Sequence, residues 1–217
     1  MTTIEKSFLK RDYWINNTDF YKVPYFRLEK CAKIINALTP TGEYDLLDIG
    51  CGPATLSKLI GKNVHYYGID IAIHVPADNL IEIDVSKHEI NFKGMQFDII
   101  VATGLFEYLG EFQRQKLSEI QKLLKANGRF ITTYTNFNHI HPPLQEPTYN
   151  NVITIKEFRN DLDLFFSVEK SFPSSHNWIR REPQRNWVKK LNMLINFKIP
   201  YLSRRLANNY FFICTPK

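Results

Sequence analysis

Short apolar runs alternate along the chain with segments in which apolar side chains recur every three or four positions. The apolar runs predict strands at residues 45–49, 64–70, 80–84, 97–102, 129–135, 165–168 and 210–214. The periodic segments predict helices at residues 25–38, 53–60, 111–125 and 154–162. Strands and helices that alternate in this way are typical of an α/β fold, in which helices cover a mainly parallel sheet.

Three connections carry local signals of their own. Only residues 71–79, with a proline at 76, separate the second and third strands, so we expect one helical turn or a loop in place of a crossover helix. Asn127 and Gly128 are expected to supply the left-handed residue that ends the helix at 111–125. Thr154 and Glu157 have capping-box spacing. No internal repeat and no Gly/Ser-rich linker divides residues 1–217, which predicts a single domain.

Composition narrows the class of protein. With 44% hydrophobic residues in a chain of 217, the sequence is too apolar for a disordered protein. No apolar run approaches the ~18 residues that a membrane span needs, and charges stand at the amino terminus where a signal peptide would be apolar. We therefore expect a cytoplasmic protein without a transmembrane segment. Cys31, Cys51 and Cys214 are odd in number and form no C-x-x-C pair, so neither a disulfide framework nor a zinc site is predicted.

Charge is distributed unevenly. Residues 1–169 carry 18 basic and 21 acidic side chains, whereas residues 170–217 carry 10 basic side chains and one acidic one, Glu182. The basic segment is compatible with an ordinary solvated surface. It is equally compatible with an anionic partner, such as a nucleotide-linked or carboxylated substrate, an acidic carrier protein, a nucleic acid or a membrane surface.

A glycine-rich turn, D-I-G-C-G-P-A at residues 48–54, follows the first predicted strand. Glycine at 50 and 52 permits a tight turn and lets backbone N–H groups approach a ligand. Dinucleotide enzymes lay a pyrophosphate on such a turn and have a third glycine, which would fall at Thr55. That glycine is absent. Asp48 instead places a carboxylate before the first glycine, where it would repel pyrophosphate and suits a ligand's ammonium group.

Several motifs resemble, in order and spacing, those of the class I methyltransferases that use S-adenosylmethionine. The turn resembles their first motif, D/E-x-G-x-G-x-G. Asp70, 20 residues after Gly50, resembles the acid that binds both ribose hydroxyls, although alone it would suit NAD equally. Asp84-Val85 resembles the pair that reads adenine, although a lone Asp at a strand end is also a common cap or turn residue. The resemblance covers about residues 25–135 and includes F-D-I-I-V-A at 97–102, F-E-Y-L at 106–109 and L-L-K-A-N-G-R-F-I at 123–131.

The resemblance implies a Rossmann-like three-layer sandwich, with a mainly parallel seven-stranded sheet and an antiparallel last strand. It implies residues 1–42 as an amino-terminal helical lid, 43–135 as the cofactor-binding core, and 136–217 as substrate loops, the basic segment and the last strands. The cofactor would be S-adenosyl-L-methionine, and its product S-adenosyl-L-homocysteine. The expected cofactor contacts are Asp48, Ile49, Gly50, Cys51, Gly52, Asp70, Ile71, Asp84, Val85, Thr103, Gly104 and, from the lid, Tyr13, with Tyr21 as the alternative lid residue.

The implied chemistry is direct in-line attack of a substrate atom on the activated methyl group, without a covalent enzyme intermediate. A general base near a hydroxyl nucleophile would add to the rate. The first candidates are His139 and His141, just past the fifth strand, and His176 is the third; each is also compatible with a surface or structural imidazole. A metal held by His139, His141 and Glu146 is not predicted, because two histidines in a proline-flanked loop are weak evidence.

The predicted function is methylation of a small molecule, at oxygen or nitrogen, in a sugar or natural-product intermediate for example. Methylation of a carrier-bound or macromolecular substrate through the basic segment is the first alternative, and a binding protein that has lost turnover is the second. Nucleic acid is disfavoured, because Ala102-Thr103-Gly104-Leu105 stands where methylators of exocyclic amines usually carry D/N-P-P-Y/F. The expected partner is a small-molecule substrate, which the basic segment suits if that substrate is anionic, with an acidic carrier protein as the alternative.

Overall fold

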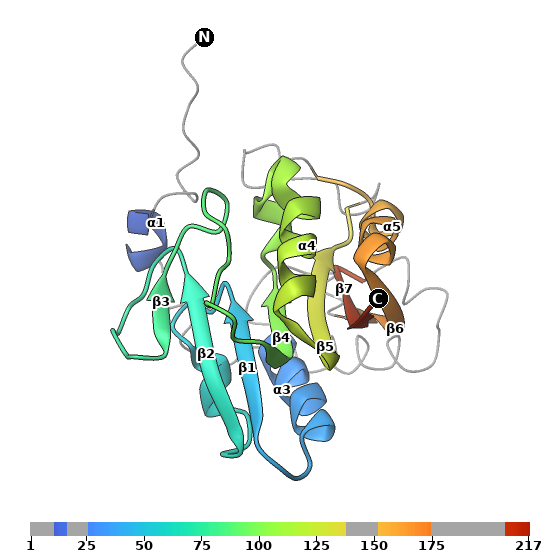
Figure 1. The fold of residues 1–217 in the computed structure, drawn as a ribbon. Helices are drawn as coiled ribbons and strands as arrows, with labels where there is room; N and C mark the ends of the chain where they lie inside the picture. Colours follow the sequence, from blue (N-terminus) through green and yellow to red (C-terminus); the bar gives the residue numbers. More distant parts are fainter. Residues whose placement is uncertain (1–10, 17–25, 138–151, 175–206) are drawn as a thin grey trace, which may run out of the picture.

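The computed structural model describes residues 11–16, 26–137, 152–174 and 207–217 (Figure 1). A seven-stranded sheet with the order β3-β2-β1-β4-β5-β7-β6 forms the centre of the molecule. Its strands are β1 (Tyr44–Ile49), β2 (Val64–Asp70), β3 (Leu80–Glu82), β4 (Phe97–Thr103), β5 (Leu124–Thr135), β6 (Phe166–Ser174) and β7 (Asn209–Pro216).

Strands β1 to β5 pair in parallel, and β7 runs antiparallel to both of its neighbours, β5 and β6. This confirms the predicted mainly parallel sheet with a reversed last strand. The chain crosses over between β1 and β4, which are neighbours in the sheet but not in sequence. The loops that leave the carboxyl ends of β1 and β4 diverge at such a point, and open α/β sheets bind their ligands there.

The α-helices in the described part of the chain are α1 (Arg11–Asn16), α3 (Phe26–Leu38), α4 (Gln113–Leu123) and α5 (Ile155–Phe165). α3 covers one face of the sheet, and α4 and α5 cover the other. Cys31, Ala32 and Ile35 of α3 pack on one face, against Leu46 of β1 and Ile99 of β4. Alternate residues of the strands point the other way, which is why the sheet is apolar on both sides.

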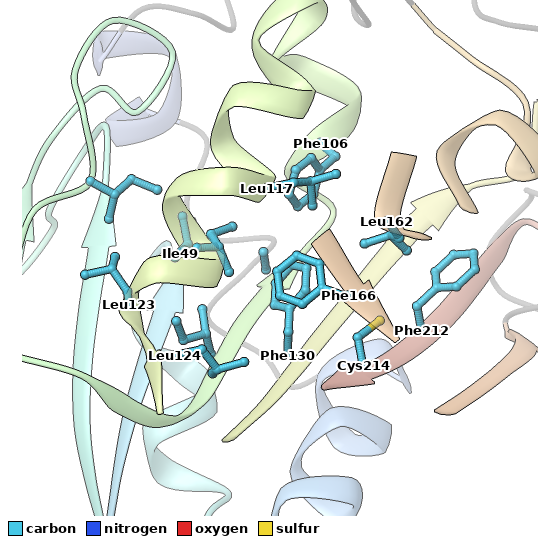
Figure 2. Packing of buried hydrophobic residues seen from close by; sticks show 14 of the residues in the cluster. Ile49, Phe106, Leu117, Leu123, Leu124, Phe130, Leu162, Phe166, Phe212 and Cys214 are labelled. Atoms are coloured by element: carbon cyan, nitrogen blue, oxygen red, sulfur yellow. The ribbon is translucent and has the colours of Figure 1, made fainter. Parts of the chain in front are cut away.

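The opposite face packs against α4 and α5, and Figure 2 shows this second cluster. Leu117 from α4 and Leu162 from α5 meet Phe130 of β5 and Phe212 of β7 there, all almost completely buried. The cluster joins the early strands to β7 across most of the sheet. Three layers, α3, the sheet, and α4 with α5, therefore form the predicted sandwich (Figure 1).

The helix predicted from Pro53 to about residue 60 was wrong, because only a 3₁₀ helix of four residues, Thr55–Lys58, forms there. Gly52 and Ala54 both have positive φ angles, of 52° and 53°, so the backbone enters the helical region only at Thr55. Residues 71–79 contain no helix, as the short connection predicted.

The helix termination at Asn127 and Gly128 was also wrong. Neither residue is left-handed, and Leu124 turns directly from α4 into the extended conformation. Leu124 is 3% exposed and pairs with Phe97 of β4, so burial beside that strand ends the helix earlier than the glycine would. The capping box was confirmed, since Thr154 Oγ1 accepts the Glu157 N–H and the Glu157 side chain accepts the Thr154 N–H.

Candidate active site

A cavity of about 290 Å³ lies where the carboxyl ends of β1, β2 and β4 meet the loop after β3. All of the predicted cofactor contacts line it except Ile49 and Tyr13. Ile49 points into the cluster under α4, and Tyr13 is 39% exposed. The neighbour of Tyr13, Trp14, lines the cavity instead and meets the ring of Tyr108 edge to face at 5.9 Å. The cofactor contact of Tyr13 therefore stays a prediction, and Trp14 is the residue of α1 that lines the cavity. The alternative lid residue, Tyr21, lies outside the described residues.

Asp48, near the end of β1, is 4% exposed. The Tyr66 hydroxyl of β2 donates a hydrogen bond of 2.8 Å to its Oδ2. Burial raises the pKa of Asp48 to about 7, with Asp70 adding to the rise and the Tyr66 hydrogen bond opposing it. A buried carboxylate of this kind is stabilised by a cation, because a positive charge beside it offsets the loss of hydration.

The backbone N–H groups of the glycine turn donate hydrogen bonds to residues of β2. The N–H groups of Gly50 and Cys51 both donate to the Ile69 carbonyl of β2, at 2.8 and 3.1 Å. The Gly52 N–H donates to Asp70 Oδ2 at 2.8 Å. Gly50 has a φ of 77°, and a Cβ there would approach Leu105 to 3.3 Å, so the turn needs glycine at this position. These donors point back to β2 rather than toward a ligand.

This arrangement decides against the dinucleotide alternative. A pyrophosphate site needs free N–H groups at the start of a helix. Here the donors of the turn are occupied, the element that follows is a four-residue 3₁₀ helix, and Asp48 and Asp70 put two carboxylates beside it. The cavity therefore suits a ligand with ammonium and hydroxyl groups better than one with a pyrophosphate.

Asp70 and Asp84 also line the cavity. Asp70 accepts the Gly52 N–H and the Ala72 N–H, one on each oxygen, and burial raises its pKa while these backbone hydrogen bonds oppose the rise. Asp84 Oδ1 accepts both the N–H and the hydroxyl of Ser86, at 3.0 and 2.6 Å. Asp84 is thus a turn residue and a cavity residue at once, since each carboxylate oxygen can accept more than one hydrogen bond.

The far wall of the cavity follows β4. Gly104, with a φ of 69°, donates its N–H to Thr133 Oγ1 of β5 at 2.9 Å. Arg27 of α3 packs its guanidinium so closely on Gly104 that any side chain there would overlap it. Glu107 is 1% exposed in a 3₁₀ helix, Phe106–Tyr108, and its pKa is raised by burial.

Sequence reasoning missed several lining residues: Trp14, Arg27, His74, Glu107 and Thr135. Glu107 lies in the F-E-Y-L segment at residues 106–109, which is part of the family resemblance. Its position in that motif was the sequence feature that could have indicated it as a site residue. Arg27 lies on a correctly predicted helix, but periodicity does not show which residue of that helix meets the turn after β4.

The candidate general bases His139, His141 and His176 lie outside the described residues. Among the residues that the structure describes, no group of three His, Cys, Asp or Glu side chains is arranged to hold a metal ion. Within the same residues, no helix has the length and apolar character to cross a membrane.

Comparison with known proteins shows which protein family this architecture resembles. Residues 47–130 match the family model described as a methyltransferase domain. This part of the chain is similar to a methyltransferase domain. The match begins in β1, includes the glycine turn and the four acids that line the cavity, and ends in β5. The cofactor of this domain class is S-adenosylmethionine.

Individual relatives of the methyltransferase domain are distant. A malonyl-[acyl-carrier protein] O-methyltransferase of Calditerrivibrio nitroreducens is 25% identical over 131 residues, which is 57% of this chain and 52% of that protein. The match spans about half the length of that relative. Sequence similarity at this level does not identify the substrate.

Solved structures share the fold over nearly the whole chain. An S-adenosylmethionine-dependent methyltransferase from Archaeoglobus fulgidus has a TM-score of 0.61 and 18% identity, covering 94% of this chain and 99% of its own. The 1,6-didemethyltoxoflavin-N1-methyltransferase of Burkholderia thailandensis, solved with its substrate and S-adenosylhomocysteine, has a TM-score of 0.62 and 13% identity, covering 97% and 88%. These likenesses show a common fold for the methyltransferase domain.

Proposed function

We propose that this chain binds S-adenosylmethionine in the cavity and transfers its methyl group to an oxygen or nitrogen atom of a small molecule. One observation supports the proposal most strongly: Asp48, Asp70 and Asp84 follow or end three separate strands and yet line one cavity. An adenosine that carries an ammonium group offers each of these carboxylates a donor, because ammonium, ribose hydroxyl and adenine amino groups all donate hydrogen bonds.

In this proposal each of the three acids binds a different part of the cofactor. Asp48 holds the ammonium group, Asp70 the ribose hydroxyls, and Asp84 with Val85 the adenine. When bound, the cofactor supplies a methyl group that a positively charged sulfur already activates. The contribution of the chain is then to hold the substrate atom in line and within ~3 to 3.5 Å of that group.

Arg27 suits the carboxylate at the amino-acid end of the same cofactor. Arg27 of α3 lines the cavity together with Asp48 of β1, and its guanidinium lies beside Gly104. A cation and an anion that line one pocket match a ligand that carries both an ammonium and a carboxylate. A guanidinium also binds a carboxylate through two hydrogen bonds, which fixes its orientation.

A small-molecule substrate is supported by the walls around the remaining space. Trp14, Tyr108 and Leu109 line the cavity and give it an apolar side next to the acids. Sites for small ligands usually combine an apolar lining with a few polar groups. The B. thailandensis structural relative, named for a toxoflavin precursor, is compatible with this view.

A carrier-bound substrate is the second candidate. The C. nitroreducens relative is named for a malonyl group on acyl-carrier protein, and residues 170–217 of this chain carry 10 basic side chains against one acidic one. A basic segment of this kind attracts an acidic partner. Product formation with a free small molecule, compared with the same molecule on a carrier protein, distinguishes the two.

Calorimetry tests the cofactor assignment. We expect S-adenosylmethionine and S-adenosylhomocysteine to bind the purified protein with one site per chain and NAD not to bind. Transfer of labelled methyl groups to a panel of hydroxyl and amine compounds then tests turnover. Binding of NAD in preference to both adenosyl ligands would overturn the proposal.

Asp70→Ala should weaken the binding of S-adenosylhomocysteine by about 1 to 3 kcal/mol, the usual cost of losing a charged hydrogen-bond acceptor. Asp78→Ala is the matched control, because Asp78 is exposed in the loop that follows Asp70 and does not line the cavity. Equal affinity in the two variants would remove Asp70 from the ribose site.

His139→Ala and His141→Ala test the general-base prediction. If either imidazole accepts the substrate proton, the variant loses turnover by about 10²-fold or more and keeps its affinity for S-adenosylhomocysteine. Rates equal to wild type in both variants would exclude these histidines as bases.

A further inference from the structure

Glu107 is the one acid of the cavity that the cofactor assignment leaves without a role. It lies beyond β4 in the short 3₁₀ helix Phe106–Tyr108, on the side of Trp14 and Tyr108. The residue lines the cavity although only 1% of it is exposed. A carboxyl group in such a position is normally held by hydrogen bonds on both oxygens, because an unpaired buried charge is costly.

The two oxygens of Glu107 differ. Oε1 accepts the backbone N–H and the hydroxyl of Thr135, both at 2.7 Å. Thr135 is the last residue of β5, so the carboxyl group is anchored to the sheet. Oε2 is buried and has no hydrogen-bond partner among the described residues. Oε1 is therefore fixed by hydrogen bonds to Thr135, whereas Oε2 has no donor among the described residues.

Charged and titratable groups reach this carboxyl from two elements. Arg27 on α3 favours its ionised form, and the Tyr134 hydroxyl on β5 interacts with it electrostatically. Burial acts in the opposite direction and raises the pKa of Glu107 above the ordinary value of 4.5. A carboxyl group with a raised pKa is a better proton acceptor than an exposed one, because its basicity lies closer to neutral pH.

We propose that Glu107 Oε2 receives the hydrogen of the substrate's nucleophilic N–H or O–H group and takes its proton during methyl transfer. This inference rests on the proposed function and deepens it. In the step, the nitrogen or oxygen lone pair forms a bond to the methyl carbon as the carbon–sulfur bond breaks, and that bonding pair stays on sulfur. The proton moves from the nucleophile to Glu107, which returns it to solvent after product release.

The inference restricts the substrate class. A carboxylate nucleophile has no proton to give and would set a second negative charge against the buried Glu107 side chain. An amine or a hydroxyl group supplies the donor that Oε2 lacks. Substrates methylated on nitrogen or on a hydroxyl oxygen are therefore favoured over substrates methylated on a carboxylate.

Two probes of equal size and opposite character test this without knowledge of the substrate. Benzylamine and benzoate are titrated by ligand-observed NMR into protein saturated with S-adenosylhomocysteine, so that the cofactor's carboxylate occupies Arg27. We expect benzylamine to bind at least tenfold more tightly than benzoate in the wild type. In Glu107→Gln the ratio should fall to within about threefold of unity. A ratio that is the same in both proteins overturns the inference.

Thr135→Val is the matched control. It removes the hydroxyl that anchors Oε1 but leaves Oε2, so it reports the effect of loosening the carboxyl group. We expect this variant to keep the preference for benzylamine. If Thr135→Val and Glu107→Gln abolish the preference equally, Glu107 acts only through the structure of the loop, and the inference fails.

A second measurement uses the wild-type protein and so does not depend on the folding of a variant. The carboxyl carbon of Glu107 is followed by ¹³C NMR as the pH is changed in the complex with S-adenosylhomocysteine. We expect its pKa to lie above the ordinary range and to fall by at least one unit when benzylamine is added. A pKa that benzylamine does not change overturns the inference. Failure of S-adenosylhomocysteine to bind would instead overturn the proposed function.

Discussion

The two sides of the cavity are built differently. On the side of β1, β2 and β3, each acid already has a protein partner: Asp48 has the Tyr66 hydroxyl, Asp70 two backbone N–H groups and Asp84 the Ser86 side chain. On the side of β4 and β5, Glu107 keeps one buried oxygen without a partner among the described residues. The first side is organised before any ligand arrives, as suits a constant cofactor, and the second leaves a donor to be supplied by the substrate.

The largest expected effect concerns Asp48 and the stability of the ligand-free protein. Its pKa is about 7 in the folded chain against an ordinary 3.8, so between these pH values the folded state binds more protons than the unfolded state. The free energy of unfolding should therefore fall as the pH rises, by about 2 to 3 kcal/mol from pH 5 to pH 8 through this group alone.

Urea unfolding of wild type and Asp48→Asn at both pH values isolates this contribution. Asparagine keeps an acceptor for the Tyr66 hydroxyl and has no charge to bury. We expect the variant to gain stability relative to wild type as the pH rises. If the free energies of unfolding of the variant and the wild type differ by the same amount at both pH values, Asp48 is ionised at little cost.

The second prediction concerns the boundary between the two sides, at Gly104. Gly104→Ala should displace the Arg27 guanidinium and weaken binding of S-adenosylhomocysteine by about 1 to 3 kcal/mol, the range for a lost charged hydrogen bond. Gly94→Ala is the control, because Gly94 also has a positive φ, of 87°, but no atom lies within 4 Å of an added Cβ.

Both glycine variants should lose similar stability from backbone strain, about 1 kcal/mol. Only Gly104→Ala should lose cofactor affinity, measured by calorimetry. If both variants bind equally well, Arg27 does not contact the cofactor.

The smallest expected effect is the pH dependence of cofactor binding. Asp48 must be ionised to hold an ammonium group, and a pKa of about 7 means that its ionised fraction rises about tenfold between pH 6 and pH 8. The affinity for S-adenosylhomocysteine should rise by nearly the same factor, or about 1.4 kcal/mol. Asp48→Asn should bind weakly and show a flatter profile. A wild-type affinity that falls with pH over this range would contradict the assignment of Asp48.

The sequence predicted the sheet well because each strand is a local apolar run bounded by breakers. The acids of the first side were readable for the same reason, since Asp48, Asp70 and Asp84 each stand at or just after a strand end. The backbone after β1 was not readable, because the left-handed conformation of Ala54 depends on the hydrogen bonds that tie the turn to β2.

The second side was mostly missed because its parts come from distant positions in the chain. Trp14, Arg27 and Thr135 lie on α1, α3 and β5, and nothing local in the sequence marks them as neighbours. Glu107 belongs to the F-E-Y-L motif at residues 106–109. The motif alone predicts no role for it, because a motif does not show that one carboxylate oxygen is buried without a partner among the described residues. Contacts between residues that are distant in the sequence determine which residues line this side and which buried atoms have hydrogen-bond partners.

The position of β7 between β5 and β6 bears on how the protein is made. β6 pairs with β7, and β7 alone joins it to the rest of the sheet. During translation, a nascent chain that has reached residue 174 cannot place β6, because residues 209–216 have not yet been synthesised. Deleting this last segment would therefore remove β7, detach β6 and expose Phe130 and Ile131 of β5 along an open edge, which is a surface prone to aggregation.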